Sequence, residues 1–172
     1  KNEPFPRDKL YNIVADYNAI LSTVTEKFDM DILRAKDKLE IISNYAVGLD
    51  NIDLEYARSI GITVYNTPDV VTNSTADLTF SILLSLVRKI PSAQKFVRQN
   101  KWSAWDPEMF LGEELSGKNF GIWGFGRVGQ AVAKRAYGFG LKIIYYNHNT
   151  VSSVQNPYFK PVELNELLET SD

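Results

Sequence analysis

The stretch Asn119-Phe120-Gly121-Ile122-Trp123-Gly124-Phe125-Gly126-Arg127-Val128-Gly129 decides the fold of this chain. It reads as a short apolar strand that runs directly into the pattern Gly-x-Gly-x-x-Gly. In such a turn Gly124 permits a tight bend, Gly126 lets the backbone approach a phosphate, and Gly129 lets helix and strand pack closely. A helix that starts here also points its positive end at an anion. The stretch therefore predicts a site for a dinucleotide pyrophosphate.

The residues behind this stretch separate a nucleotide site from a chance glycine-rich turn. Residues 130–137 place small and apolar side chains on one side and basic side chains on the other, which is typical of a helix packed on a sheet. Gly138 and Gly140 end that helix, and residues 141–146 indicate a second, buried strand. Strand, glycine turn, helix and strand make up the βαβ unit that the fingerprint requires.

Composition and charge exclude several classes of function. A formal net charge of −2 gives no electrostatic reason to expect nucleic acid or an anionic membrane as a partner. No apolar run reaches membrane-spanning length. The lack of cysteine excludes disulfides, metal–thiolate sites and a thiol nucleophile. We expect a cytoplasmic protein without a metal site.

The first part of the chain alternates strands and helices, which predicts a parallel α/β sheet. The second of its strands ends in the glycine-containing turn Tyr45-Ala46-Val47-Gly48-Leu49-Asp50. We predict helices over residues 8–16, 29–35 and 53–58, and strands over residues 19–24, 39–44 and 62–66.

Thr67-Pro68 interrupts this alternation and leads into a long helix over about residues 75–90. Apolar side chains cover most of its circumference, so it needs burial by more than one surface. The helix is either a core helix between two domains or, in addition, part of a subunit interface. Pro91 predicts a kink or an end, with a continuation over residues 92–99. An irregular loop follows, whose large apolar side chains could pack on the glycine strand, a partner subunit or a substrate pocket. These side chains are Trp102, Trp105, Met109 and Phe110.

Three segments, in this order and spacing, resemble the D-isomer-specific 2-hydroxyacid dehydrogenases. They are residues 44–53 (NYAVGLDNID), residues 66–78 (NTPDVV through TADL) and residues 124–131 (GFGRVGQA). Residues 102–107 (WSAWDP), with FLG at residues 110–112, narrow the resemblance to the glyoxylate/hydroxypyruvate reductases.

The resemblance implies two doubly wound parallel α/β domains with a cleft between them, both incomplete in this chain. Residues 1–67 would be part of a flavodoxin-like substrate-binding domain. Residues 68–172 would be the N-terminal part of a Rossmann-type NAD(P)-binding domain. The implied reaction is hydride transfer between NAD(P)H and a small 2-keto or 2-hydroxy acid such as glyoxylate or hydroxypyruvate. From the apolar character of the long helix we also expect a homodimer formed through residues 75–110.

The resemblance also assigns site residues. Backbone amides at Val47 and Gly48 would hold the substrate carboxylate; without the resemblance, this segment reads as an ordinary strand-to-helix turn in which Asp50 or Asp53 caps the next helix. The cofactor-binding residues would be those of the glycine turn, the segment after the following strand, and one threonine. In full, they are Gly124, Phe125, Gly126, Arg127, Val128, Gly129, Asn147, His148, Asn149 and Thr75.

Residues 147–150 (Asn-His-Asn-Thr) bear on the choice of cofactor. NAD-specific sites usually place a carboxylate here, which holds the ribose hydroxyls and repels the 2′-phosphate of NADP. The segment has no acid, which permits NADP, and no arginine that could grip the phosphate. We expect NADP or NAD, with a preference for NADP. His148, the only histidine, lies at the adenosine end, so we do not expect it to be catalytic.

The catalytic set implied by the resemblance is an arginine, a carboxylate and a histidine, and the family carries all three beyond the point where this chain ends. Arg127 belongs to the phosphate side of the site. We therefore expect no catalytic residue within the chain and no turnover by it alone. The alternative is a catalytically inactive dinucleotide-binding or interaction module derived from the same family.

Overall fold

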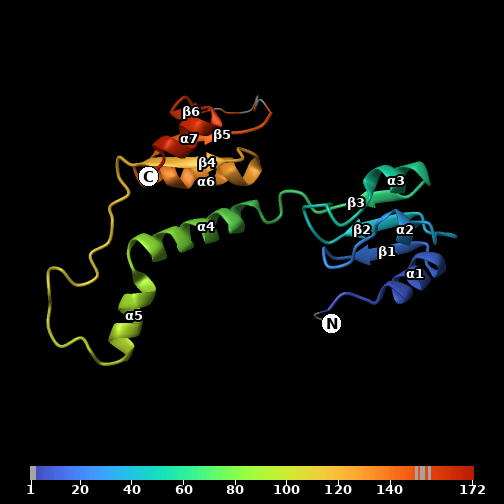
Figure 1. The fold of residues 1–172 in the computed structure, drawn as a ribbon, viewed down its shortest axis with the longest axis horizontal. Helices are drawn as coiled ribbons and strands as arrows, with labels where there is room; N and C mark the ends of the chain where they lie inside the picture. The colour runs from blue at the N-terminus through green and yellow to red at the C-terminus, as the bar shows by residue number, and fades with distance from the viewer. Residues whose placement is uncertain (1–2, 150, 152–153, 155) are drawn as a thin grey trace. The chain divides into compact units, whose positions relative to one another are not determined.

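The computed structural model describes residues 3–149, 151, 154 and 156–172. The chain forms two compact units, Lys1–Val71 and Thr72–Asp172. Each unit contains a three-stranded parallel sheet flanked by helices (Figure 1). The expected α/β class with parallel sheets is confirmed.

The first unit pairs its strands in chain order, β1-β2-β3. Asp29 and Asp53 begin two of its helices, because each carboxylate accepts a backbone N–H three residues further on, at 3.1 Å and 3.0 Å. The Arg7 guanidinium binds Asp29 through both oxygens and holds the pKa of that carboxyl below its usual range. The elements are α1 (Arg7–Asp16), β1 (Ala19–Ser22), α2 (Met30–Leu33), β2 (Ile41–Asn44), α3 (Leu54–Ser59) and β3 (Thr63–Tyr65).

One face of this sheet carries the core. Ile20, Ile42 and Val64 are register partners, and they pack with residues of α1, α2 and α3. Since successive side chains of a strand point to opposite faces, the neighbouring row lies on the other side of the sheet. In that row Leu21 is 78% exposed and Tyr65 is 56% exposed. The helices of the first unit therefore share a single core around Ile42.

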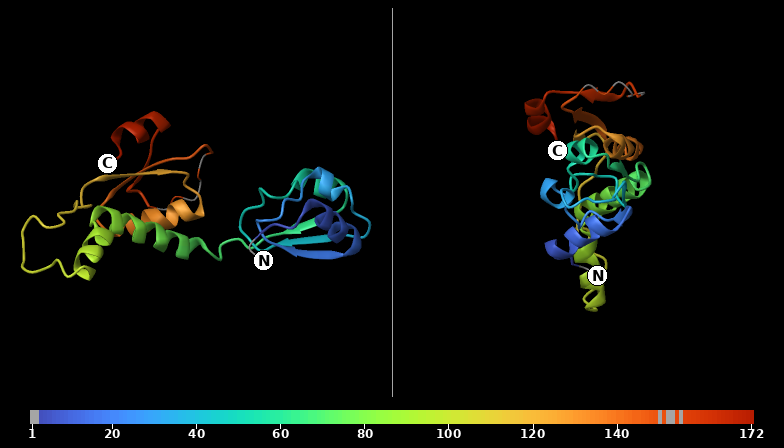
Figure 2. Two further views of the ribbon diagram at one scale, coloured as in Figure 1. Left: turned by 60° about the horizontal axis from the view of Figure 1, so that its bottom comes forward. Right: turned by 90° about the vertical axis from the view of Figure 1, so that its right-hand side faces the viewer.

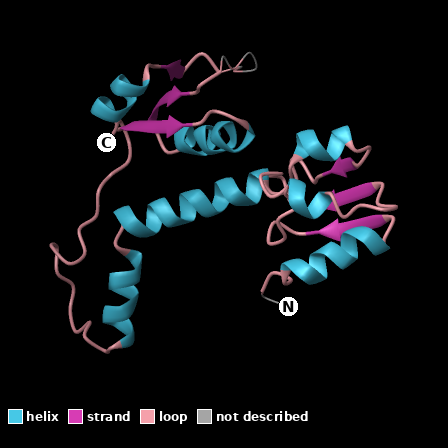
Figure 3. Cartoon of the chain, turned by 45° about the vertical axis from the view of Figure 1, so that its right-hand side comes forward, coloured by secondary structure: helices cyan, strands magenta, loops and turns pink. Residues whose placement is uncertain are grey.

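The second unit has helices on both faces of its sheet, which has the order β4-β5-β6 (Figure 3). Helices α4 and α6 share a core with Ile122 of β4. Its neighbour Gly121 faces α7, and a side chain there would collide with Leu167 and Ser171. The elements are α4 (Thr72–Val87), α5 (Ile90–Arg98), β4 (Asn119–Trp123), α6 (Arg127–Gly138), β5 (Lys142–Tyr146), β6 (Phe159–Pro161) and α7 (Leu164–Thr170).

The long helix is interrupted where Pro91 predicts it. Helix α4 ends at Val87, Lys89 adopts a left-handed conformation, and α5 begins at Ile90 with Pro91 in its first turn. The break between the two helices can be followed in Figure 2. Within the second unit α4 is buried on one side, through Ala76 and Phe80. Its opposite side is exposed. The second unit therefore does not provide the second surface that the apolar sequence of this helix predicts.

The loop that follows α5, with Trp102, Trp105, Met109 and Phe110, packs only in part. Phe110 meets Phe96 of α5 edge to face, with ring centroids 5.3 Å apart. Trp105, by contrast, is 81% exposed and Trp102 is 60% exposed. Helix α5 is thus a packing partner of this loop within the second unit.

Among the helices of the described residues, none combines the length and apolar character needed to cross a lipid bilayer.

The one-sided core of the first unit predicts unequal effects of two truncations in neighbouring strands. Ile42→Ala removes a fully buried side chain and should lower the free energy of unfolding of this unit by about 2–5 kcal/mol. Leu21→Ala, on the exposed face, should change it by less than about 0.5 kcal/mol. All three tryptophans lie in the second unit. Urea unfolding should therefore be followed by hydrogen exchange of first-unit peptides; equal losses for the two variants would contradict the assigned core.

Candidate functional site

The structure joins the two cofactor segments expected from the sequence. The glycine turn follows β4, residues 147–149 follow β5, and adjacent parallel strands end at the same edge of a sheet. The Gly124 N–H donates to the Tyr146 carbonyl at 2.8 Å, and the Phe125 N–H donates to Asn147 Oδ1 at 2.8 Å. The turn after one strand is therefore fastened to the segment after the next.

The three glycines of the turn are there for different reasons. Gly124 has a φ of 96°, which strongly favours glycine. A side chain at Gly129 would collide with the carbonyl oxygen of Gly124. Gly126 has a φ of −74°, and apart from its two chain neighbours no residue that the structure describes has an atom within 4 Å of where its Cβ would be. The fold thus explains Gly124 and Gly129, while the open cradle at Gly126 fits a molecule lying against the backbone, as a dinucleotide pyrophosphate does.

Helix α6 starts directly at this turn. Gly126 is its N-cap and provides no side-chain cap, and the positive end of the helix dipole lies at the first turn. Arg127 and Val128 are exposed there. Phe125 differs from the other expected cofactor residues, because its ring is fully buried and stacks on Tyr145 with centroids 3.8 Å apart. Its side chain shapes the turn and presents no surface to a ligand.

A cavity of about 640 Å³ lies beyond the end of β5. Asn147 is occupied at both ends of its amide, because it accepts from Phe125 and donates to the Asn149 carbonyl at 2.7 Å. The exposed His148 and Asn149 also line the cavity. So does the carboxylate residue Glu163, at the start of α7.

Glu163 is not among the site residues expected from the sequence, because the sequence does not predict strand β6. That strand has three residues and contains a proline, so its pattern is too short to predict a strand. Once β6 pairs with β5, the segment after it reaches the same edge as residues 147–149.

Thr75, the remaining expected cofactor residue, lies exposed in the first turn of α4. Arg135 of α6 holds that end of α4, binding Asp77 at 2.6 Å.

In the first unit, the turn after β2 occupies the equivalent edge position. Asp53 caps α3 just behind it, as the ordinary reading of this segment expects. The turn has a further property. Val47 and Gly48 are exposed, and within the described part of the chain no acceptor lies within hydrogen-bonding distance of the N–H groups of residues 47–49. Successive backbone N–H groups without an acceptor are one means by which a turn can bind a small anion.

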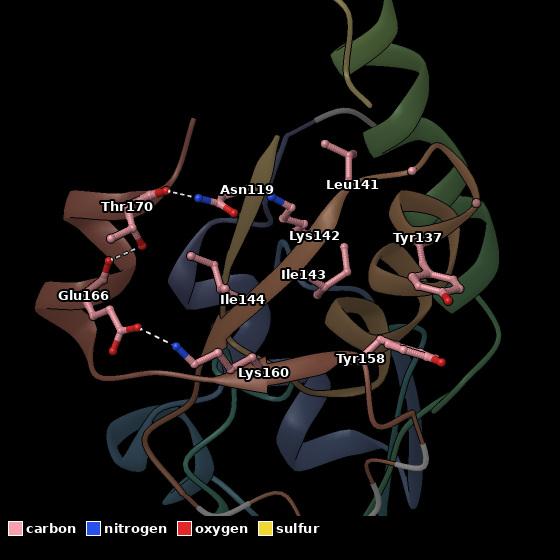
Figure 4. Close-up of a pocket in the computed structure, with 12 residues that line it drawn as sticks. Asn119, Tyr137, Leu141, Lys142, Ile143, Ile144, Tyr158, Lys160, Glu166 and Thr170 are labelled. Atoms are coloured by element: carbon pink, nitrogen blue, oxygen red, sulfur yellow. Dashed lines mark hydrogen bonds and ion pairs between the residues drawn. The ribbon is translucent and has the colours of Figure 1, made fainter. Parts of the chain in front are cut away.

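A second cavity, of about 830 Å³, lies near the beginnings of β4 and β5 (Figure 4). Tyr137 and Tyr158 stack at its border with centroids 5.5 Å apart, and Lys160 pairs with Glu166 at 2.9 Å. Open α/β sheets bind ligands at the carboxyl ends of their strands, so we do not assign the cofactor to this cavity. Among the described residues, no cluster of histidine and acidic side chains could hold a metal ion.

A parallel sheet with a glycine turn leading into a helix, fastened to the end of the next strand, defines a dinucleotide-binding α/β protein. The family model for the D-isomer specific 2-hydroxyacid dehydrogenase, NAD binding domain, matches residues 80–172. The chain belongs to this family, which confirms the resemblance found in the sequence.

Relatives and solved structures agree with this assignment. The chain is 45% identical to the glyoxylate reductase of Pyrococcus furiosus over 174 residues, covering 97% of the chain and 51% of the relative. It is 47% identical to the glyoxylate reductase of Thermococcus litoralis over 172 residues, covering 97% and 52%. The crystal structure of the TT0316 protein from Thermus thermophilus matches with a TM-score of 0.88 and 38% identity, covering 98% and 53%. The chain thus spans about half the length of these proteins.

The different roles of the glycines predict different effects of the same substitution. Gly126→Ala fills the open cradle and should weaken dinucleotide binding at least about tenfold while leaving the melting temperature unchanged. Gly129→Ala forces the turn and α6 apart and should destabilise the second unit by more than about 2 kcal/mol. Calorimetric titration with NADPH and thermal melting by tryptophan fluorescence measure the two effects. An unchanged NADPH affinity in Gly126→Ala would show that the dinucleotide does not lie against the backbone at Gly126.

Proposed function

We propose that this chain supplies the dinucleotide-binding and carboxylate-binding parts of an oxidoreductase that transfers a hydride between NAD(P)H and a small 2-keto acid. The substrates we propose are glyoxylate, hydroxypyruvate and acids of similar size. The open cradle at Gly126, beside the start of α6, is the observation that carries the proposal. The names of the glyoxylate reductases to which the chain is similar support the class of substrate.

In this proposal one turn binds the cofactor and the other binds the substrate carboxylate. The turn at residues 124–129 and the start of α6 would hold the pyrophosphate, and residues 147–149 would hold the ribose at the adenosine end. When bound, the nicotinamide supplies a hydride to the carbonyl carbon of the keto acid. The N–H groups of residues 47–49 would bind the carboxylate and so orient the neighbouring keto group. None of these residues is proposed to supply the proton that completes the hydroxyl; His148, the only histidine of the sequence, is exposed and would lie at the adenosine end.

We favour NADP over NAD as the cofactor. The absence of a carboxylate in residues 147–150 removes the usual repulsion of a 2′-phosphate. Glu163 and Glu166 line the same cavity and limit this preference, although Glu166 is paired with Lys160. We therefore propose that both cofactors are accepted and that NADPH is used better.

A turnover assay of the whole protein tests this function. We expect reduction of glyoxylate and hydroxypyruvate with NADPH, and a lower kcat/KM with NADH. Binding of NADPH without turnover of any small 2-keto acid would instead indicate an inactive dinucleotide-binding module. No binding of either dinucleotide would contradict the site itself.

The exposed side of α4 supports a homodimer as part of the proposal. Leu78, Ile82 and Leu86 lie four residues apart, hence on one face of the helix, and are 60%, 61% and 74% exposed. This face borders a cavity of about 790 Å³ that continues to Pro91 at the start of α5. An apolar helix face of this kind is typical of an interaction surface. We propose a second copy of the chain as its partner.

A charge placed on that face should therefore separate the subunits. Ile82→Glu should convert a dimer into a monomer, as measured by size-exclusion chromatography with light scattering. Leu168→Glu provides the control, because Leu168 is similarly exposed, at 62%, on α7 of the same unit. Dimers that persist in Ile82→Glu, or that dissociate equally in Leu168→Glu, would rule out the α4 face as the interface.

A further inference from the structure

Two asparagine side chains hold the backbone of the turn after β2. Asn66 Nδ2 donates to the Val47 carbonyl at 2.8 Å. Asn44 Nδ2 donates to the Gly48 carbonyl at 3.0 Å. Two successive carbonyl groups are therefore fixed by side-chain amides, one from the last residue of β2 and one from the residue after β3.

Fixing a carbonyl also fixes the N–H of the same peptide unit. Every peptide bond of this turn is trans, so the C=O and N–H of each planar unit point in opposite directions. The Ala46 carbonyl, next to these two, accepts from the Thr67 N–H at 2.9 Å. The three carbonyls of residues 46–48 thus point to their donors, and the N–H groups of residues 47–49 point away from them. This explains why all three lack an acceptor among the residues that the structure describes.

The orientation of the Asn44 amide is itself determined by its surroundings. Asn51 Nδ2 donates to the Glu26 carbonyl at 2.9 Å, and a carbonyl can only accept. Asn51 must therefore turn its oxygen toward Asn44, whose Nδ2 lies 3.1 Å from that oxygen. Ser22 donates to Asn44 Oδ1 at 3.0 Å and completes the set. Asn44 is fully buried, so this network has a single arrangement in which its NH₂ group reaches Gly48.

We propose that Asn66 and Asn44 are positioning residues for anion binding: they hold the N–H groups of residues 47–49 toward the ligand without touching it. This inference rests on the carboxylate role proposed for that turn. Asp50 is itself negative and lies beside Gly48, so the attraction must come from the amides. Loss of the Asn66 donor frees the peptide unit between Val47 and Gly48 to rotate, and one of the three N–H groups then leaves the site.

Asn66 provides the sharper test, because it is only half-buried and its replacement leaves the core intact. In the ¹⁵N-labelled chain, oxalate should shift the amide signals of residues 47–49. The oxalate affinity of Asn66→Ala should be about tenfold weaker, as expected for one lost hydrogen bond. Asn66→Asp, of equal size but without a donor, should weaken binding further. Asn18→Ala is the matched control, because the exposed Asn18 also donates to a backbone carbonyl, that of Lys38, at 3.3 Å.

A second readout, the residual dipolar coupling of the Gly48 N–H without ligand, separates this inference from the proposed function. One outcome is that the wild type binds no oxalate, while the dipolar coupling of the Gly48 N–H changes in Asn66→Ala and stays the same in Asn18→Ala. The positioning role then stands and the carboxylate role fails. If the wild type binds oxalate and Asn66→Ala changes neither affinity nor coupling, the positioning role is wrong. Equal losses in Asn18→Ala would also overturn it, because they would indicate general destabilisation.

Discussion

Parallel strand pairing is the constraint on which both candidate sites depend. It brings the segments that follow neighbouring strands to one edge of each sheet, where their side chains can reach each other. Asn66, after β3, thereby reaches Val47 in the turn after β2. Asn147, after β5, reaches Phe125 in the turn after β4. In both units an asparagine that follows one strand braces the turn that follows its neighbour.

The two braced turns differ in what they offer a ligand. The glycine turn of the second unit offers bare backbone and the start of a helix, which suits a pyrophosphate lying along it. The turn of the first unit offers three free N–H groups held by their carbonyls, which suits a small carboxylate. Neither turn has a buried lysine or arginine, so no cation needs to be desolvated before the anion binds. Both candidate sites would therefore rely on backbone geometry more than on the charge of buried side chains.

The sequence predicts the elements that depend on local pattern and misses the contacts that depend on register. The glycine spacing predicts the tight turn at Gly124 and the close packing at Gly129, because both follow from neighbouring backbone. The asparagine braces are not predictable in this way, since Asn66 and Val47 are 19 residues apart and meet only after β2 and β3 pair. The same holds for Glu163, whose position depends on the pairing of a strand too short to predict. Burial of Phe125 is also a consequence of packing, here on Tyr145.

A crystal structure of the protein with NADPH and oxalate is the most direct measurement of whether these two turns are the ligand sites. We expect the pyrophosphate at residues 124–129, against Gly126, and an oxalate carboxylate within hydrogen-bonding distance of the N–H groups of residues 47–49. The dinucleotide bound instead in the cavity between Tyr137 and Lys160, or oxalate bound away from the turn after β2, would contradict the account.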